Sequence, residues 1–106
     1  MGKYKVLEST VTSSIIRYIE RQERSHAVKI ISSAKSRNNP DIFAVVEGTP
    51  IVIESKREKD GSYGITIGQG YELLRWDRAG AIILVAPTLR DVQTVVERIK
   101  KTKPLT

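Results

Sequence analysis

Cysteine is absent from the chain, and histidine occurs once, at His26. The absence of cysteine excludes disulfides, thiolate zinc sites and cysteine nucleophiles. A single histidine argues against a histidine-built metal site and against a Ser-His-Asp triad. Any chemistry that the chain performs must therefore use carboxylates and lysine.

Long hydrophobic runs are also missing, because no stretch of 18 or more apolar residues occurs and no charged segment precedes an apolar leader. We therefore expect neither a membrane span nor a secretory signal, and a soluble, intracellular protein of the cytoplasm. The 106 residues, 40% of them hydrophobic, suit one compact domain over residues 1–106 and are too few for two.

Charge is unbalanced toward the positive side, with 18 Lys plus Arg against 12 acidic residues and a formal net charge of +6. Such an excess suits a polyanionic partner such as DNA. Many basic proteins bind no nucleic acid, so the charge alone leaves the partner open.

Apolar residues recur at helical spacing near the N-terminus and predict a first helix from Leu7 to about Glu23. At 100° per residue, Glu8 falls inside the apolar stripe and Glu20 falls on the opposite, solvent-facing side. Glu8 is therefore predicted to point inward. The alternative is that Glu8 only complements the helix dipole and points into water.

The remaining pattern predicts an α/β fold in the order αβββαβα, with a central mixed sheet flanked by helices. The continuously apolar run 81–86 indicates an interior strand, covered on both faces. Thr88 and Asp91 form a capping signature for the last helix, and Gly80 marks the end of the helix before that strand. The expected strands are 27–31, 41–46, 51–56 and 81–86, and the second helix is expected at about 67–79.

The two central strands form a predicted hairpin whose register decides which side chains share a face. An even loop over residues 47–50 pairs Val46 with Ile51, so that Phe43 stands opposite Glu54 and Asp41 opposite Lys56. Asp41, Glu54 and Lys56 then project from one face, with the two carboxylates as diagonal neighbours about 7 Å apart or less. An odd loop would send Asp41 to the other face.

Two neighbouring carboxylates that face water repel each other unless a cation lies between them. Oxygen ligands without Cys or His favour a hard ion, Mg²⁺ or Mn²⁺, over zinc. Lys56 on the same face could polarise water or stabilise charge on a phosphate, so the cluster fits phosphodiester hydrolysis. The competing interpretation is a charged strand whose solvent face reads Glu-x-Lys by chance.

Asn39-Pro40-Asp41 followed by Glu54-Ser55-Lys56 resembles the P-D and E-x-K motifs of the PD-(D/E)XK nuclease superfamily. Within it, the chain looks most like VRR-NUC nucleases and Holliday junction resolvases, from Leu7 to about Val96. The resemblance implies a restriction-endonuclease-like core. Two departures are Asn39, where that pattern usually has glycine, and Ser55, which replaces an apolar residue.

The resemblance also implies a role for each matched residue. Asp41 and Glu54 would bind the metal, with the carbonyl of Ser55 as a further ligand. Lys56 would assist the nucleophilic water, Glu8 would hold a metal-bound water or second ion, and Gln69 would orient a ligand or the phosphate. Gln69 also has a structural interpretation, because its place at the end of an inward stripe suits capping of buried backbone.

Several polar residues are candidates for DNA contact. Lys29 matches a lysine that the resemblance places in the first strand. Lys35, Arg37 and Asn38 lie in a polar loop leading to Asp41, where they could contact phosphates, or else the loop has no ligand. Trp76 is predicted to be core, because it lies in the middle of a helical stripe. The sequence indicates no partner for His26, which is expected to be a surface or loosely packed residue.

We therefore expect a Mg²⁺-dependent DNA endonuclease, acting by analogy with resolvases on branched or four-way-junction DNA. A four-way junction has two-fold symmetry, which suits a homodimer. One alternative is a nucleic-acid-binding module that keeps the fold without turnover. Another is a small structural or regulatory subunit whose charged hairpin is only a solvated face.

Overall fold

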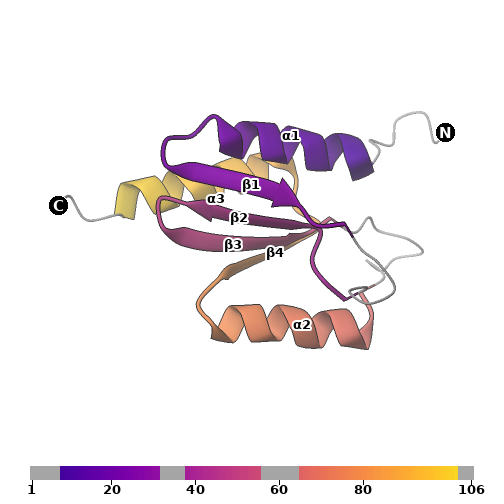
Figure 1. Cartoon of the computed structure of the whole chain (residues 1–106). Helices are drawn as coiled ribbons and strands as arrows, with labels where there is room; N and C mark the ends of the chain where they lie inside the picture. The colour runs from indigo at the N-terminus through magenta and orange to yellow at the C-terminus, as the bar shows by residue number, and fades with distance from the viewer. Residues whose placement is uncertain (1–7, 32–37, 56–64, 103–106) are drawn as a thin grey trace.

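The computed structural model describes residues 8–31, 38–55 and 65–102, with the side chains of 8 and 9 excluded. These residues form a single α/β domain with one mixed four-stranded sheet and three helices (Figure 1). The elements are α1 (Glu8–Glu20), β1 (Ser25–Lys29), β2 (Ile42–Val46), β3 (Thr49–Glu54), α2 (Ile67–Arg78), β4 (Ile82–Val85) and α3 (Leu89–Thr102).

The sheet has the strand order β1-β2-β3-β4. The β1–β2 and β2–β3 pairs are antiparallel, and β3 pairs with β4 in parallel through the connection that contains α2. Helices α1 and α3 lie together on one face, and α2 lies on the other (Figure 1). The parallel neighbour expected from the strand-helix-strand pattern is therefore present.

The main core lies between the sheet and the α1–α3 layer. Alternate residues of β2 and β3 enter it, namely Ile42, Ala44, Val46, Ile51 and Ile53, each at most 1% exposed. They meet side chains of α1 and α3 such as Ile15, Ile19, Val92 and Val96. A smaller cluster on the other face joins Val52 to Leu73 of α2, with Phe43 and Trp76 at its edge.

The β2–β3 hairpin has a shorter loop than the sequence predicted. Val46 pairs with Thr49, not Ile51, and only Glu47 and Gly48 connect the strands. Both have positive φ, 48° and 85°, which is the backbone of a tight two-residue hairpin turn. The loop is still even, so the predicted faces are correct. The pairing moves by two residues, so the continued register brings Asp41 opposite Glu54 in place of Lys56.

Strand β4 is at an edge of the described sheet, so its predicted interior position is wrong. Its apolar run has another cause, because both of its faces meet helices. Ile82 and Leu84 pack against the main core, whereas Ile83 packs in the smaller cluster with Leu73 of α2. A strand whose two faces are both covered by helices is apolar even when it has a neighbouring strand on one side only. Val85 at its end is 42% exposed.

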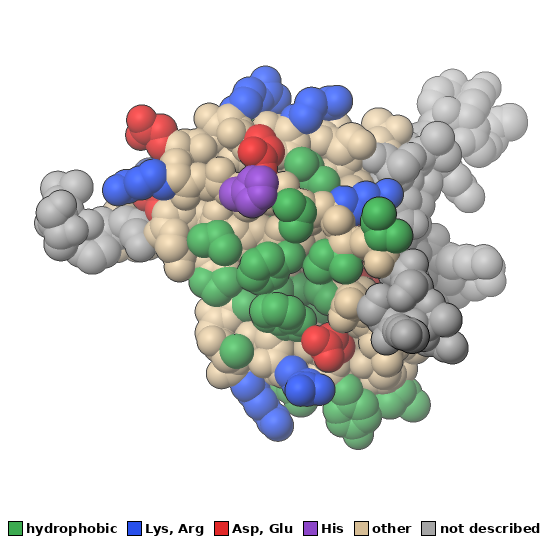
Figure 2. Space-filling view, viewed as in Figure 1, with side chains coloured by type: hydrophobic (Ala, Val, Ile, Leu, Met, Phe, Trp, Pro, Cys, Tyr) green, Lys and Arg blue, Asp and Glu red, His purple; other side chains and the backbone are tan. Residues whose placement is uncertain are grey.

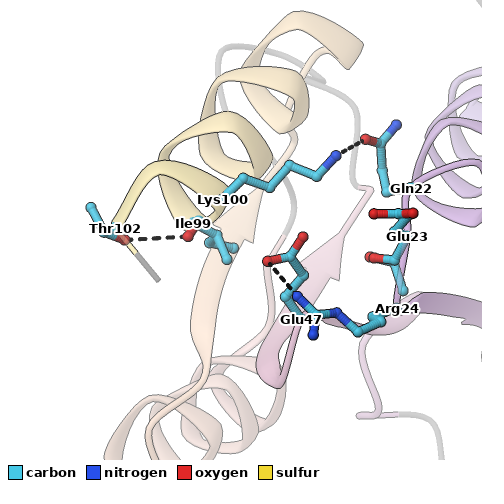
Figure 3. A network of polar contacts seen from close by, with 8 residues as sticks. Gln22, Glu23, Arg24, Glu47, Ile99, Lys100 and Thr102 are labelled. Carbon is cyan, nitrogen blue, oxygen red and sulfur yellow. Dashed lines mark hydrogen bonds and ion pairs between the residues drawn. The ribbon is translucent and has the colours of Figure 1, made fainter. Parts of the chain in front are cut away.

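Polar contacts join the C-terminal helix to the turn after α1 (Figure 3). Lys100 Nζ donates to Gln22 Oε1 at 2.6 Å, and Arg24 lies 3.7 Å from Glu47 in the hairpin turn. Lys100 therefore links the last turns of α3 to the turn that follows α1. At the other end of α3, Thr88 and Asp91 form the expected reciprocal cap.

None of the described helices is both long and apolar enough to cross a membrane.

Candidate active site

Asp41 lies one residue before β2, at the end of the hairpin away from its turn. Its N–H donates to Ile53 O at 3.0 Å, and its carbonyl accepts from Ile30 N–H at 2.7 Å. Its carboxylate Oδ2 accepts from the backbone N–H of Ser55 at 2.7 Å. The carboxylate is therefore held against the last residues of β3, beside the E-x-K motif.

Glu54 ends β3 and is 1% exposed. By strand alternation it shares a face with Val52, which is the face that α2 covers. The sequence predicted two carboxylates facing water, and for Glu54 this is wrong because α2 lies over it. A buried ionisable carboxylate of this kind is costly and is concentrated at functional sites.

Gln69 connects α2 to Glu54. Its Oε1 accepts from Thr66 N–H at 3.0 Å, and its Nε2 donates to Glu54 Oε2 at 3.2 Å. Thr66 Oγ1 accepts in turn from Gln69 N–H at 3.1 Å, which completes a capping box. The capping interpretation of Gln69 is therefore confirmed. The same amide contacts the predicted ligand Glu54, and its role in orienting a ligand or the phosphate stays a prediction.

Thr66 was missed by the sequence prediction, although a signal for it existed. Thr66-x-x-Gln69 is the S/T-x-x-E/Q pattern of a capping box, placed immediately before a helix. The box orients the amide of Gln69, because its oxygen end is used by the Thr66 N–H. Only the nitrogen end is then available to Glu54, and a donor is what a carboxylate needs.

Ser55 follows Glu54 and is 6% exposed. Its hydroxyl Oγ is buried and has no hydrogen-bond partner among the described residues. Because side chains alternate along an extended chain, the Ser55 side chain turns to the face opposite that of Glu54, toward the main core. The backbone N–H of Ser55 holds Asp41, so this residue joins the two carboxylates through its main chain.

The two described DNA-contact candidates lie in different places. Asn38 packs against the first turn of α2, where a Cβ added at Gly68 would lie 2.8 Å from its side-chain atoms. It is therefore next to the helix end that carries Gln69. Lys29 is exposed and pairs with Ile42, which places it on the α1–α3 side of the sheet, away from Glu54.

Four predicted site residues have side chains that lie outside the described part of the chain. Lys35, Arg37 and Lys56 lie outside the described residues. Glu8 begins α1, four residues before the buried Thr12, but its side chain also lies outside the described part. The position of Glu8 in the helix agrees with the predicted phase, and the direction of its carboxylate stays a prediction.

The described residues supply part of the ligand set that a divalent cation needs. Asp41 and Glu54 offer carboxylate oxygens and Ser55 offers a carbonyl, a set that suits Mg²⁺ or Mn²⁺. Within residues 8–31, 38–55 and 65–102, no group of three or more His, Cys, Asp or Glu side chains could hold a metal. The described part therefore supplies two carboxylates, and Glu8 is the residue expected to complete the site.

A second polar cluster at the other end of β1 was not expected. His26 Nδ1 lies 2.7 Å from Glu20 Oε2, and the same oxygen accepts from Ala27 N–H at 2.7 Å. His26 lies at the surface as expected, with its side chain 74% exposed, and it has a partner that the sequence did not indicate. Ala27 N–H, followed by His26, holds the pKa of Glu20 below its usual value.

The chain matches no protein-family model, no curated protein and no solved structure. The assignment of the site therefore depends on the residues themselves.

Proposed function

We propose that the chain is a Mg²⁺- or Mn²⁺-dependent DNA endonuclease of the PD-(D/E)XK type, with Asp41 and Glu54 as metal ligands. The observation that carries the proposal is the burial of Glu54 at the end of β3, in contact with Gln69 and beside Asp41. The alternative, a structural or regulatory subunit whose charged hairpin faces solvent, would leave this glutamate exposed. The restriction-endonuclease-like core and VRR-NUC character are part of the same proposal.

Each residue would contribute through its own position. Asp41 is oriented by the Ser55 N–H, and Glu54 by the Gln69 amide, so both carboxylates are preorganised before any ligand arrives. The Gln69 amide is a neutral donor, so this contact orients the Glu54 carboxylate without bringing a positive charge to it. Lys56, two residues after Glu54, would assist the nucleophilic water. The bound cation would supply water activation and charge neutralisation at the phosphate.

Branched or four-way-junction DNA is the proposed substrate. The net charge of +6 suits the phosphate backbone, and the small domain leaves little surface for reading bases. Recognition of DNA shape is therefore favoured over recognition of sequence.

The test is cleavage of linear, nicked, flap and four-way-junction DNA with Mg²⁺, Mn²⁺ or EDTA. We expect ion-dependent cleavage, strongest on branched substrates, and a loss of about 100-fold or more in Asp41→Asn and Glu54→Gln. Asp77→Asn is the matched control, because it removes a carboxylate from the exposed side of α2 and should cleave like the parent.

Circular dichroism confirms that each variant is folded before its activity is compared. DNA binding without cleavage under any ion would support the non-catalytic binding module instead. Undiminished cleavage by folded Glu54→Gln would overturn the assignment of the site.

A further inference from the structure

The first turn of α2 has little that holds it on the sheet. Of residues 66–72, all of which the structure describes, Gln69 is the single buried one. Ile67 and Tyr71 are 80% and 66% exposed, and Figure 2 shows hydrophobic side chains projecting from the surface over α2. The first buried apolar residue of the helix is Leu73, one turn further on. A first turn without a buried apolar side chain is expected to fray.

Two glycines weaken this turn further. Gly68 and Gly70 both lie in it, and glycine lowers the stability of a helix because it loses more backbone freedom than other residues. Neither has the positive φ that would require glycine. At Gly68 the reason is space, because an added Cβ would lie 2.8 Å from both Nδ2 and Oδ1 of Asn38. Gly68 therefore makes room for the Asn38 amide, which lies directly on the first turn of α2.

Asn38 belongs to a stiff part of the chain. Asn39 precedes a proline and is therefore restricted to extended conformations, whereas Pro40 has a fixed φ and is fully buried. The next residue, Asp41, makes main-chain hydrogen bonds to the strands on both sides of it. Residues 38–41 are therefore fixed to the sheet and can hold the Asn38 amide in place against α2.

The contact bears on Glu54 through Gln69. Gln69 follows Gly68 directly, and its amide accepts from Thr66 N–H and donates to Glu54 Oε2. In Figure 1 this end of α2 lies at the same end of the sheet as the end of β3 and the beginning of β2. If the first turn moved off the sheet, the Gln69 amide would leave Glu54 and the burial of this carboxylate would be lost.

We propose that Asn38 is a positioning residue, which keeps the first turn of α2 closed over Glu54 and so keeps the Gln69 amide on this carboxylate. Partners that orient a ligand from behind raise the affinity of the site for its cation. The link to the cation rests on the proposed function. Asn38 then acts through Gln69, in place of the contact with a DNA phosphate that the sequence suggested.

The first test is amide hydrogen exchange of the full chain, without metal or DNA, with the protection factor of Gln69 N–H as the readout. Asn38→Ala should lower this protection factor by about 5-fold or more, because the turn loses its contact with residues 38–41. Gly68→Ala should lower it similarly. Asn38 is exposed, and the added methyl meets only the end of its flexible side chain, so both variants should fold.

Gly70→Ala is the matched control, because a Cβ at this position meets nothing within 4 Å. Alanine favours helix over glycine, so Gly70→Ala should keep or raise the protection factor. In the Asn38→Ala background, Gly68→Ala should lower it no further, because the amide that it displaces is already gone. A further fall in the double variant, or undiminished protection in Asn38→Ala, overturns the proposal.

The second test is the affinity for Mn²⁺, measured from the electron paramagnetic resonance signal of the free ion. Asn38→Ala should raise the Kd about 10-fold, and Gly70→Ala should bind like the parent. An unchanged Mn²⁺ affinity together with weaker DNA binding would assign Asn38 to the DNA contact and overturn its positioning role. A parent that binds no Mn²⁺ would overturn the proposed function, whereas the exchange experiment would still decide whether Asn38 holds α2.

Discussion

Glu20 and Glu54 show how differently two glutamates of this chain are placed. Helical phase correctly predicted that Glu20 lies on the outer side of α1, yet its partner His26 could not be foreseen. That contact depends on how β1 returns beside the helix, which is a tertiary feature. For Glu54 the strand and its face were predictable, but its burial was not, because burial depends on α2 packing over the strand end.

Glu20 leads to a prediction on pH. Its pKa lies below the usual 4.5 because Ala27 N–H, and then His26, favour the charged form. Its stabilising contribution is therefore complete above the pKa of the unfolded chain and is lost as pH falls through the lower folded value. We expect Glu20→Gln to lower the urea midpoint at neutral pH, by an amount that shrinks at pH values below about 4.

Urea unfolding of parent and variant at several pH values provides the measurement. Glu23→Gln is the control, because it removes the same charge from the exposed turn that follows α1. A Glu20→Gln deficit that is equally large at low pH would contradict the role of the charged carboxylate.

The hairpin and the capping box show what could be predicted at the scale of elements. Each helix and strand starts or ends within a few residues of its expected range, because periodicity determines where an element lies. The hairpin register was two residues off, because Thr49 and Pro50 were assigned to the turn although both belong to β3. The faces of the strands were still predicted correctly, because Glu47 and Gly48 also make a loop with an even number of residues.

The capping box gives a prediction for α2. Thr66→Ala removes the hydroxyl that accepts from Gln69 N–H and should lower the free energy of unfolding by about 1 kcal/mol. Thr66→Ser keeps the acceptor and should recover most of the loss. Denaturant unfolding monitored by circular dichroism measures both variants.

Thr94→Ala is the matched control, because its hydroxyl donates to Arg90 O within α3 and caps no helix end. Its change should stay within about 0.5 kcal/mol. If Thr66→Ala unfolds at the parent's midpoint, the box contributes nothing to stability.

At the scale of the whole molecule, length and composition predicted one domain, and the order of the elements predicted an α/β fold with a mixed sheet. The structure has that architecture. The edge position of β4 could not be predicted, because an edge strand with helices on both faces has the same apolar sequence as an interior strand. The distribution of the helices, with α1 and α3 on one face of the sheet and α2 on the other, could not be predicted either, because it depends on the placement of α2.

The positive charge of the molecule gives a prediction that depends on the proposed function. The logarithm of the DNA-binding constant should fall linearly with the logarithm of the salt concentration, because phosphates release counterions when the protein binds them. Lys29→Ala should reduce the slope by about one if Lys29 contacts a phosphate. Fluorescence anisotropy with a labelled four-way junction at several salt concentrations measures the slope.

Lys101→Ala removes the same charge from the exposed end of α3 and should keep the parent's slope. An identical slope for Lys29→Ala would instead place Lys29 outside the contact with DNA.

The shared amide of Gln69 has a consequence for motion. Helix ends fray, and fraying of the first turn of α2 would break the cap at Thr66 and the contact with Glu54 in a single opening event. Exchange of the backbone N–H proton of Gln69 with solvent therefore reports whether the cap and the contact with Glu54 are intact. A ligand that binds only the closed arrangement would slow this exchange, so the helix end and the site would open and close as one unit.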